Sequence, residues 1–244
     1  SKRLPSPAEL SERLPLPRKL RQFVNESRQQ VVDVMEGKDD RLMAIVGPCS
    51  IHDPKAAREY AHKLREVADV HSADLLILMR TYLEKPRTSV GWRGLVNDPD
   101  LSGKEDLQRG IALGRRVLLD INMAGLPTAT EFLDPLVAPF FEDLVTYGSI
   151  GARTVESPTH RQMAAALEMP IGFKNGRSGD LTSAANAAVA ASAPQRRVAM
   201  DRKGHVAATE VMGNPWGHIV LRGSESGPNY GNDTVMAAGQ LMAK

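Results

Sequence analysis

Residues 42–54 read LMAIVGPCSIHDP, and this pattern determines the fold class that we expect. The apolar run at 42–47 is continuous rather than alternating, as is typical of a strand that is covered on both faces. Asp53 and Pro54 come next, and this pair is typical of a helix N-cap followed by proline at the first helical position. A buried strand that leads within a few residues into a helix predicts a βαβ unit.

The same alternation continues along the chain. After Pro54, apolar residues recur on one helical face at Ala57, Tyr60, Ala61, Leu64 and Ala68. Five further strands are predicted at 75–79, 126–132, 149–153, 170–174 and 218–222. Helical patterns lie between the earlier ones, at 104–119, after Ser157-Pro158 and after Asp180. Strands that alternate with helices predict an α/β protein with a parallel sheet, and six strands fit either a doubly wound sheet or an unclosed (β/α)8 barrel.

Three segments depart from this alternation. Residues 1–17 contain four prolines, which remove backbone donors, so this segment is predicted to be an extended arm. Apolar residues at helical spacing predict a helix at 18–36, which Gly37 would end. Residues 196–214 are predicted to form an inserted β-hairpin that turns at Lys203-Gly204.

The composition excludes several classes of protein. The 244 residues carry a formal net charge of +2 and one cysteine, Cys49. A near-neutral chain lacks the basic excess of nucleic-acid-binding proteins, and no apolar run approaches the roughly 20 residues of a membrane helix. A single cysteine is typical of a reducing compartment. We therefore expect a cytoplasmic protein that binds neither nucleic acid nor membrane.

Reactive or charged side chains follow every predicted strand. In chain order they are Cys49, Arg80, Lys85, Arg87, Thr88, Glu131, Arg153, Lys174 and Arg222. Taken alone, each charge is more often a solvated surface group, and the cysteine is more often a small core residue. Ligands of parallel α/β folds bind at the carboxyl ends of the strands, where these side chains would meet. The gathering of cations predicts a small phosphorylated substrate.

Six motifs then occur in a specific order. They are GPCSIHD (47–53), MRTYLEKPRTSVGWRGLVNDP (79–99), EFLD (131–134), GART (151–154), GFKNG (172–176) and HIVLRG (218–223). From about residue 20 to its end, the chain resembles the microbial type I 3-deoxy-D-arabino-heptulosonate 7-phosphate (DAHP) synthases. The resemblance implies a (β/α)8 TIM barrel with an N-terminal extension and an inserted hairpin, here lacking the last two strands.

The resemblance also implies an activity and a set of binding residues. The family condenses phosphoenolpyruvate with erythrose 4-phosphate and water to give DAHP and phosphate, the first step of the shikimate pathway to aromatic amino acids. By resemblance, phosphoenolpyruvate is held by Arg80, Lys85, Arg153, Lys174 and Arg222. The erythrose 4-phosphate site is implied to include Lys85, Arg87 and Thr88. Cys49 is implied to be one ligand of a divalent metal ion such as Mn, Fe or Co.

Two catalytic roles are hypothesised from the strand-end positions of these motifs. Lys85 is expected to protonate the forming alkoxide, and Glu131 together with Lys174 is expected to position the attacking water. The resemblance further implies that residues 1–40 form an arm and helix with oligomer or regulatory contacts. Residues 41–244 are implied to form the catalytic barrel, in a homodimer or homotetramer.

The family takes its other metal ligands, a His, a Glu and an Asp, from two later strands that this sequence does not match. We therefore expect a C-terminally incomplete synthase. One alternative is a non-catalytic phosphoenolpyruvate-binding relative or regulatory subunit without the metal centre. Another is an enzyme for a different sugar phosphate such as arabinose 5-phosphate, which the EKPRTSVGW block (84–92) disfavours. A structural domain with surface cations is the third.

Overall fold

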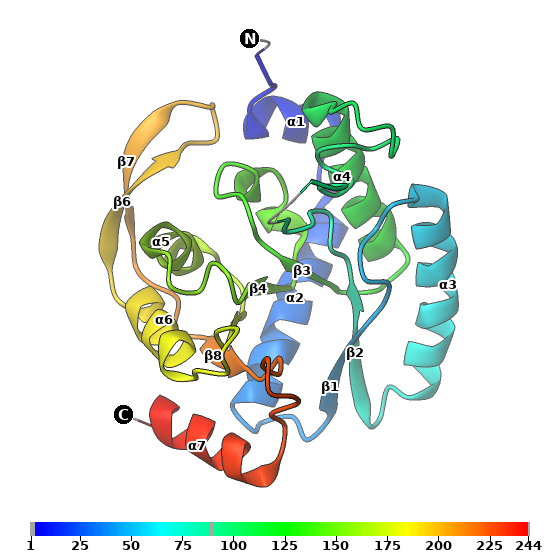
Figure 1. The fold of residues 1–244 in the computed structure, drawn as a ribbon. Coiled ribbons are helices and arrows are strands. Elements are labelled where there is room, and N and C mark those ends of the chain that lie inside the picture. The colour runs from blue at the N-terminus through cyan, green and yellow to red at the C-terminus, as the bar shows by residue number, and fades with distance from the viewer. Residues whose placement is uncertain (1–2, 88–89, 244) are drawn as a thin grey trace. The chain divides into compact units, whose positions relative to one another are not determined.

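The computed structural model describes residues 3–87 and 90–243, and the chain folds into two compact units. The first unit comprises Ser1–Tyr147 and Met200–Val206, and the second comprises Gly148–Ala199 and Ala207–Lys244. Each unit contains parallel strands together with the helices that follow them (Figure 1). The predicted α/β class is confirmed.

The first unit is built on three parallel strands. They are β1 (Leu42–Val46), β2 (Leu75–Arg80) and β3 (Thr128–Glu131), in the order β1-β2-β3. The helices that pack against them are α2 (Arg18–Met35), α3 (Pro54–Val70) and α4 (Leu107–Met123). A buried cluster that includes Val31, Leu78 and Ala129 joins α2 to the sheet. The continuous apolar run of β2 is buried as predicted, and Leu78 and Met79 are fully enclosed. The prediction that the run at 42–47 is covered on both faces is wrong, because β1 lies at the edge of the described sheet and both Leu42 and Val46 are exposed.

Helix α3 begins where the sequence predicts. The Asp53 carboxylate accepts hydrogen bonds from the backbone N–H groups of Lys55 and Ala56, and Pro54 occupies the first turn. Helix α4 begins at Leu107, three residues later than the predicted start at 104. The reason is the cap, because the Asp106 side chain accepts from the Arg109 N–H.

The prediction of a wholly extended N-terminal arm is wrong, because Pro7–Arg13 form helix α1. Ser6 and Glu9 make a reciprocal capping box, in which each side chain accepts from the other's backbone N–H. Pro7 lies at the first helical position, where its missing N–H costs nothing. The helix also contacts the hairpin tip in the same unit, where the Ala8 N–H donates to the Arg202 carbonyl oxygen at 2.8 Å.

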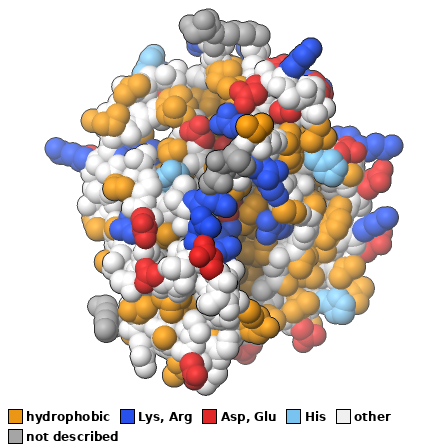
Figure 2. All heavy atoms as spheres, in the orientation of Figure 1, with side chains coloured by type: hydrophobic (Ala, Val, Ile, Leu, Met, Phe, Trp, Pro, Cys, Tyr) orange, Lys and Arg blue, Asp and Glu red, His pale blue; other side chains and the backbone are white. Residues whose placement is uncertain are grey.

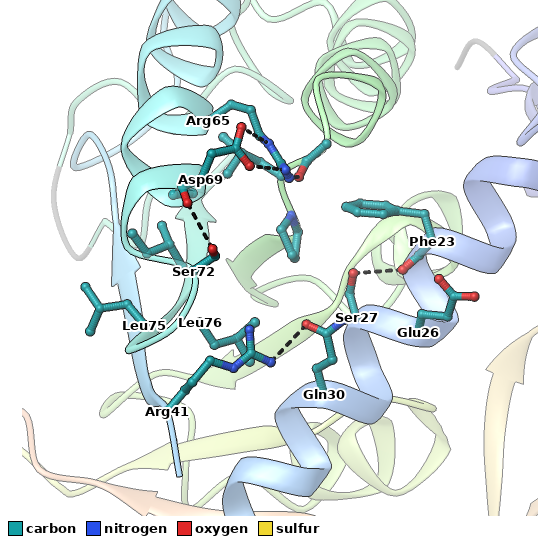
Figure 3. Close-up of a pocket in the computed structure, with 15 residues that line it drawn as sticks. Phe23, Glu26, Ser27, Gln30, Arg41, Arg65, Asp69, Ser72, Leu75 and Leu76 are labelled. Atoms are coloured by element: carbon teal, nitrogen blue, oxygen red, sulfur yellow. Dashed lines mark hydrogen bonds and ion pairs between the residues drawn. The ribbon is translucent and has the colours of Figure 1, made fainter. Parts of the chain in front are cut away.

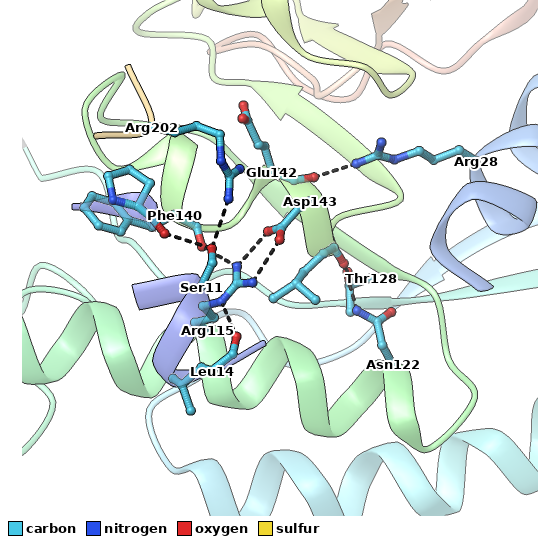
Figure 4. Close-up of polar contacts among 12 residues, drawn as sticks. Ser11, Leu14, Arg28, Arg115, Asn122, Thr128, Phe140, Glu142, Asp143 and Arg202 are labelled. Carbon is cyan, nitrogen blue, oxygen red and sulfur yellow. Dashed lines mark hydrogen bonds and ion pairs between the residues drawn. The ribbon is translucent and has the colours of Figure 1, made fainter. Parts of the chain in front are cut away.

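A buried arginine ties the end of α1 to the first unit (Figure 4). The Arg115 side chain on α4 is 1% exposed and makes a two-pronged ion pair with Asp143, with N–O distances of 2.7 and 2.9 Å. Its remaining N–H groups donate to the carbonyl oxygens of Leu14, just after α1, and Phe140. One side chain therefore joins three segments that lie far apart in the sequence.

The second unit holds three further parallel strands and most of a hairpin. The parallel strands are β4 (Tyr147–Ile150), which begins at the last residue of the first unit, β5 (Ile171–Lys174) and β8 (Gly217–Val220). The helices are α5 (Pro158–Ala166), α6 (Thr182–Ser192) and α7 (Asn232–Met242). The hairpin strands are β6 (Gln195–Met200) and β7 (Val206–Val211). Their turn holds Gly204 at φ +87°, which confirms the predicted hairpin and its turn.

The predicted strand at 149–153 is displaced, since β4 runs over Tyr147–Ile150. Beyond it, the N–H groups of Thr154 and Val155 both donate to the Gly151 carbonyl oxygen, so the chain turns there instead of extending. Six parallel strands lie in the described part of the chain. An eight-stranded barrel is not seen in these residues, and the closed barrel stays a prediction.

Candidate functional site

The strand ends of β1 and β2 bring three predicted residues together. The Lys85 Nζ lies 2.6 Å from the Cys49 Sγ, and an Arg80 N–H donates to the Cys49 carbonyl oxygen at 3.2 Å. The cause is the parallel register, which pairs Val46 with Met79 and places Gly47 against Arg80. A Cβ at Gly47 would lie 2.8 Å from the Arg80 carbonyl oxygen, so glycine permits this close approach.

The electrostatic environment of Cys49 is set by the two cations beside it, Lys85 and Arg80. The hydrogen bond from Lys85 is the main cause that lowers the pKa of the exposed Cys49 thiol, and Arg80 contributes a smaller charge effect. The Arg80 guanidinium stacks on the Tyr82 ring at 3.8 Å. Its buried Nε has no hydrogen-bond partner among the described residues. The positive charges of Arg80 and Lys85 therefore favour the binding of anions and the ionised form of the Cys49 thiol.

We expect the Lys85→Met variant to slow alkylation of Cys49 by iodoacetamide several-fold at pH 7, because loss of the cation raises the pKa of the thiol. The two rates should converge near pH 10, where both thiols are ionised. Mass spectrometry of the peptide that carries Cys49, after alkylation in EDTA, reports this site. Equal rates at pH 7 would show that Lys85 does not ionise the thiol.

The segment between β2 and α4 carries Lys85 and Arg87, and its described residues form no regular secondary structure. Leu83, Leu95 and Val96 are nonetheless buried within it, and the Lys85 N–H donates to the Arg93 carbonyl oxygen at 2.9 Å. A long loop that is packed in this way can hold side chains in a fixed place. Thr88, which the sequence analysis placed in the sugar-phosphate site, lies outside the described residues.

Two glycines allow this segment to pack so closely. Gly94 has φ +104°, and a Cβ there would lie 2.6 Å from the Glu84 Cα. A Cβ at Gly110, on α4, would lie 1.9 Å from the Val96 carbonyl oxygen. Arg87 is held by the same segment, since its Nε donates to the Trp92 carbonyl oxygen at 3.0 Å.

Glu131 and a carboxylate that the sequence analysis missed lie near the end of β3. Glu131 is 8% exposed at the last position of the strand. Burial raises the pKa of Glu84 to about 7, and the negative charges of Asp134 and Glu131 add to the shift, whereas the backbone N–H groups of Asp134 and Leu133 oppose it. The EKP and EFLD motifs are therefore in direct contact. Glu84 could have been suspected only from its place in the motif at 79–99.

Glu84 gives the stability of the fold a pH dependence. Its pKa is about 7 in the folded protein and 4.5 ordinarily, so between these pH values the folded state binds more protons and stability falls as the pH rises. We expect Glu84→Gln to be more stable than the wild type by about 3 kcal/mol at pH 8 and nearly equal to it at pH 4. Urea unfolding at both pH values measures this.

Glu59→Gln is the control for this prediction, because Glu59 is an exposed carboxylate on α3. It should leave the pH dependence of the unfolding free energy as it is in the wild type. A Glu84→Gln variant that keeps the wild-type slope between pH 4 and pH 8 would contradict the assignment.

The second unit holds three of the predicted anion-binding residues. Lys174 is the last residue of β5 and pairs in register with Val220 of β8, so Lys174 and Arg222 follow neighbouring strands. Arg153 lies in the turn after β4. Within the described chain, the guanidinium groups of Arg153 and Arg222 are exposed and have no hydrogen-bond or ion-pair partner. Both are available to an anion.

The structure thus groups Cys49, Arg80 and Lys85 in one unit, and Lys174 and Arg222 in the other. The meeting of all strand ends at one mouth stays a prediction. No group of three or more His, Cys, Asp or Glu residues in the described ranges is placed to hold a metal ion. Cys49 alone does not fit a metal centre, and its role as a metal ligand stays a prediction.

A separate cavity of about 210 Å³ lies in the first unit at the opposite end of the strands (Figure 3). It is lined by the start of β2 and by Leu126 and Pro127 before β3. Its two arginines are already paired, Arg65 with Asp69 and Arg41 with Asp39. No cation is left there for an anionic ligand, so the cavity does not compete with the strand ends.

Charged side chains of both signs share the face of the molecule that Figure 2 shows. This mixture agrees with the formal net charge of +2. Among the described residues, no helix combines the length and apolar character that crossing a bilayer demands.

Comparison with known proteins gives consistent similarities. The DAHP synthetase I family matches residues 19–244. The chain is 46% identical over 235 residues to the Trp-sensitive phospho-2-dehydro-3-deoxyheptonate aldolases of Salmonella typhi and Escherichia coli strain K12. These alignments cover 96% of the chain and 67% of each relative.

A solved structure is also similar. The phospho-2-dehydro-3-deoxyheptonate aldolase of Francisella tularensis SCHU S4 superposes with a TM-score of 0.97 at 42% sequence identity. The superposition covers 100% of this chain and 71% of that one. The relatives are therefore longer than the 244 residues described by this sequence.

Proposed function

Because the chain belongs to the DAHP synthetase I family, we propose that it catalyses the condensation of phosphoenolpyruvate with erythrose 4-phosphate and water, which gives DAHP and phosphate. This is the first step of the shikimate pathway to aromatic amino acids. The observation that carries the proposal is the Lys85–Cys49–Arg80 group after β1 and β2, which combines a proton donor with an anion-binding guanidinium. A surface domain without ligands would have no need for this arrangement.

The anionic groups of phosphoenolpyruvate are proposed to bind the strand-end cations. Arginine matches the oxygens of phosphate and carboxylate with paired donors, and a substrate with both groups calls for several such residues. The proposed set is Arg80, Lys85, Arg153, Lys174 and Arg222. The absence of side-chain partners for Arg153 and Arg222 among the described residues supports their part in it.

The aldehyde substrate is proposed to bind beside Lys85 and Arg87, with Thr88 as a third contact. Carbon 3 of phosphoenolpyruvate attacks the aldehyde carbon, a C–C bond forms and the carbonyl oxygen takes a proton. Lys85 is proposed to supply that proton. Water then adds to carbon 2, which the attack leaves electron-poor. The C–O bond to phosphate breaks as the ketone forms, and of the two protons that water loses, one returns to Lys85 and one leaves with phosphate. Glu131, with Lys174, is proposed to orient this water.

Two features of the family are proposed for this protein on the family resemblance alone. Cys49 is proposed as one ligand of a divalent metal ion, and we derive no step of the reaction through that metal. The protein is also proposed to form a homodimer or homotetramer in which residues 1–40 make contacts between subunits. Light scattering of the full-length natural protein measures the number of subunits.

The test is a phosphate-release assay on the full-length natural protein with phosphoenolpyruvate and erythrose 4-phosphate together. Each substrate alone is the blank, and arabinose 5-phosphate in place of erythrose 4-phosphate is the specificity control. We expect release only with the pair that contains erythrose 4-phosphate, together with a product whose mass is that of DAHP. Faster release with arabinose 5-phosphate, or none with either sugar, would overturn the proposal.

A further inference from the structure

Asn175 follows Lys174 directly, and its side chain is fully buried at the end of β5. Buried amides must find partners for both the oxygen and the nitrogen, because an unpaired polar group in the interior is costly. Asn175 finds all of its partners in its own unit. Neither the proposed chemistry nor the proposed binding set uses this residue.

The partners of Asn175 lie in the loop that carries Arg222. Its Oδ1 accepts from the Arg222 backbone N–H at 2.9 Å, and its Nδ2 donates to the Gly223 carbonyl oxygen at 3.0 Å. A second donation reaches the carbonyl oxygen of Gly176 at 2.8 Å. The half-buried Asn229 completes the network, since its Nδ2 donates to the Asn175 Oδ1 and its own Oδ1 accepts from the Gly223 N–H.

This network begins where the sheet ends. The parallel ladder of β5 and β8 stops at the pair Lys174–Val220, and the last backbone bond runs from the Asn175 N–H to the Val220 carbonyl oxygen. Beyond that point, the Asn175 side chain supplies the acceptor and the donor that a further strand residue would have supplied. The Arg222 backbone is therefore held in a fixed place relative to Lys174, although it has left the sheet.

An arginine whose backbone is held in this way binds an anion with less loss of freedom than one on a mobile loop. Only an amide of this length offers an acceptor and donors together, because aspartate lacks the donors. We infer that Asn175 is a positioning residue that sets the spacing of Lys174 and Arg222 for the anionic groups of phosphoenolpyruvate. This inference rests on the proposed function.

The experiment compares Asn175→Asp with Asn214→Asp in the full-length natural protein. Asn214 is the matched control, because it is 2% exposed in the same unit and its Nδ2 donates to the carbonyl oxygens of Ala164, Leu167 and Met169. Both changes leave backbone carbonyl oxygens without the N–H groups that donate to them, so both are expected to lower the unfolding free energy. We expect only Asn175→Asp to raise the KM for phosphoenolpyruvate, by about 10- to 100-fold, while the KM for erythrose 4-phosphate stays within about twofold.

If Asn175→Asp does not fold, Asn229→Ala tests the same inference. Asn229 is only half-buried, so its replacement disturbs the fold less. It should raise the KM for phosphoenolpyruvate about threefold, in the same direction and with the same selectivity. An equal rise in both KM values, or a KM for phosphoenolpyruvate that matches the Asn214→Asp control, would overturn the inference. A wild-type protein without turnover would instead overturn the proposed function, so the two failures are distinguishable.

Discussion

The Lys85→Met variant is expected to turn over phosphoenolpyruvate and erythrose 4-phosphate at about a thousandth of the wild-type rate. Lys85 is the cation nearest to Cys49, and the packed segment between β2 and α4 fixes its backbone. Methionine keeps the length and the apolar stem of lysine but cannot give up a proton. The loss should therefore appear in kcat as well as in kcat/KM, because the proton is needed only as the transition state forms.

Lys104→Met is the control for this variant. Lys104 is an exposed lysine shortly before α4, and its side chain makes no hydrogen bond or ion pair to the described residues. It should keep the wild-type rate in a steady-state phosphate-release assay. Turnover by Lys85→Met within about threefold of the wild type would refute the proton-donor role.

The Arg115→Met variant is expected to lose about 3 to 5 kcal/mol of unfolding free energy. The change leaves the Asp143 carboxylate without its ion-pair partner, and it removes the donors to the carbonyl oxygens of Leu14 and Phe140 (Figure 4). Breaking a buried pair from one side is costly because the remaining charge stays in a poorly solvated place. Urea unfolding at neutral pH measures the loss.

Arg116→Met is the matched control, since Arg116 is the next residue on α4 and is exposed. Its stability should lie within about 0.5 kcal/mol of the wild type. The double variant Arg115→Met with Asp143→Asn should recover part of the loss, because the unpaired charge is then gone. A loss below about 1 kcal/mol for Arg115→Met would show that the pair contributes no more than a surface ion pair.

The sequence predicts the elements whose signal is local. The continuous apolar runs give β1 and β2, Asp53-Pro54 gives the start of α3, and Lys203-Gly204 gives the hairpin turn. The sequence does not predict helix α1, because prolines usually interrupt helices, whereas the capping box of Ser6 and Glu9 places Pro7 at the first helical position, which tolerates it. The start of α4 differs because the Asp106 side chain caps the helix, which places Lys104 and Glu105 before it.

In the candidate site, too, the sequence predicts some contacts and not others. The contact of Lys85 with Cys49 follows from two neighbouring parallel strands, which the sequence does predict. The raised pKa of Glu84 depends on burial and on the charges of Glu131 and Asp134, which lie about 50 residues further along the chain, and no periodicity encodes that contact. The bonds of Asn175 to the backbone of Arg222 and Gly223 likewise join residues 47 and 48 positions apart. Such contacts exist only once the loops have folded against each other.

Only glycine fits at position 110 of α4. Any side chain there, even the methyl group of alanine, would meet the Val96 carbonyl oxygen at 1.9 Å, and neither α4 nor the buried residues Leu95 and Val96 can yield without shifting the segment that carries Lys85. A side chain at this helix position is therefore expected to lower turnover, although Gly110 is not among the proposed binding or catalytic residues. The range of sequences that evolution can explore around this site is limited by the backbone as strictly as by the reacting groups.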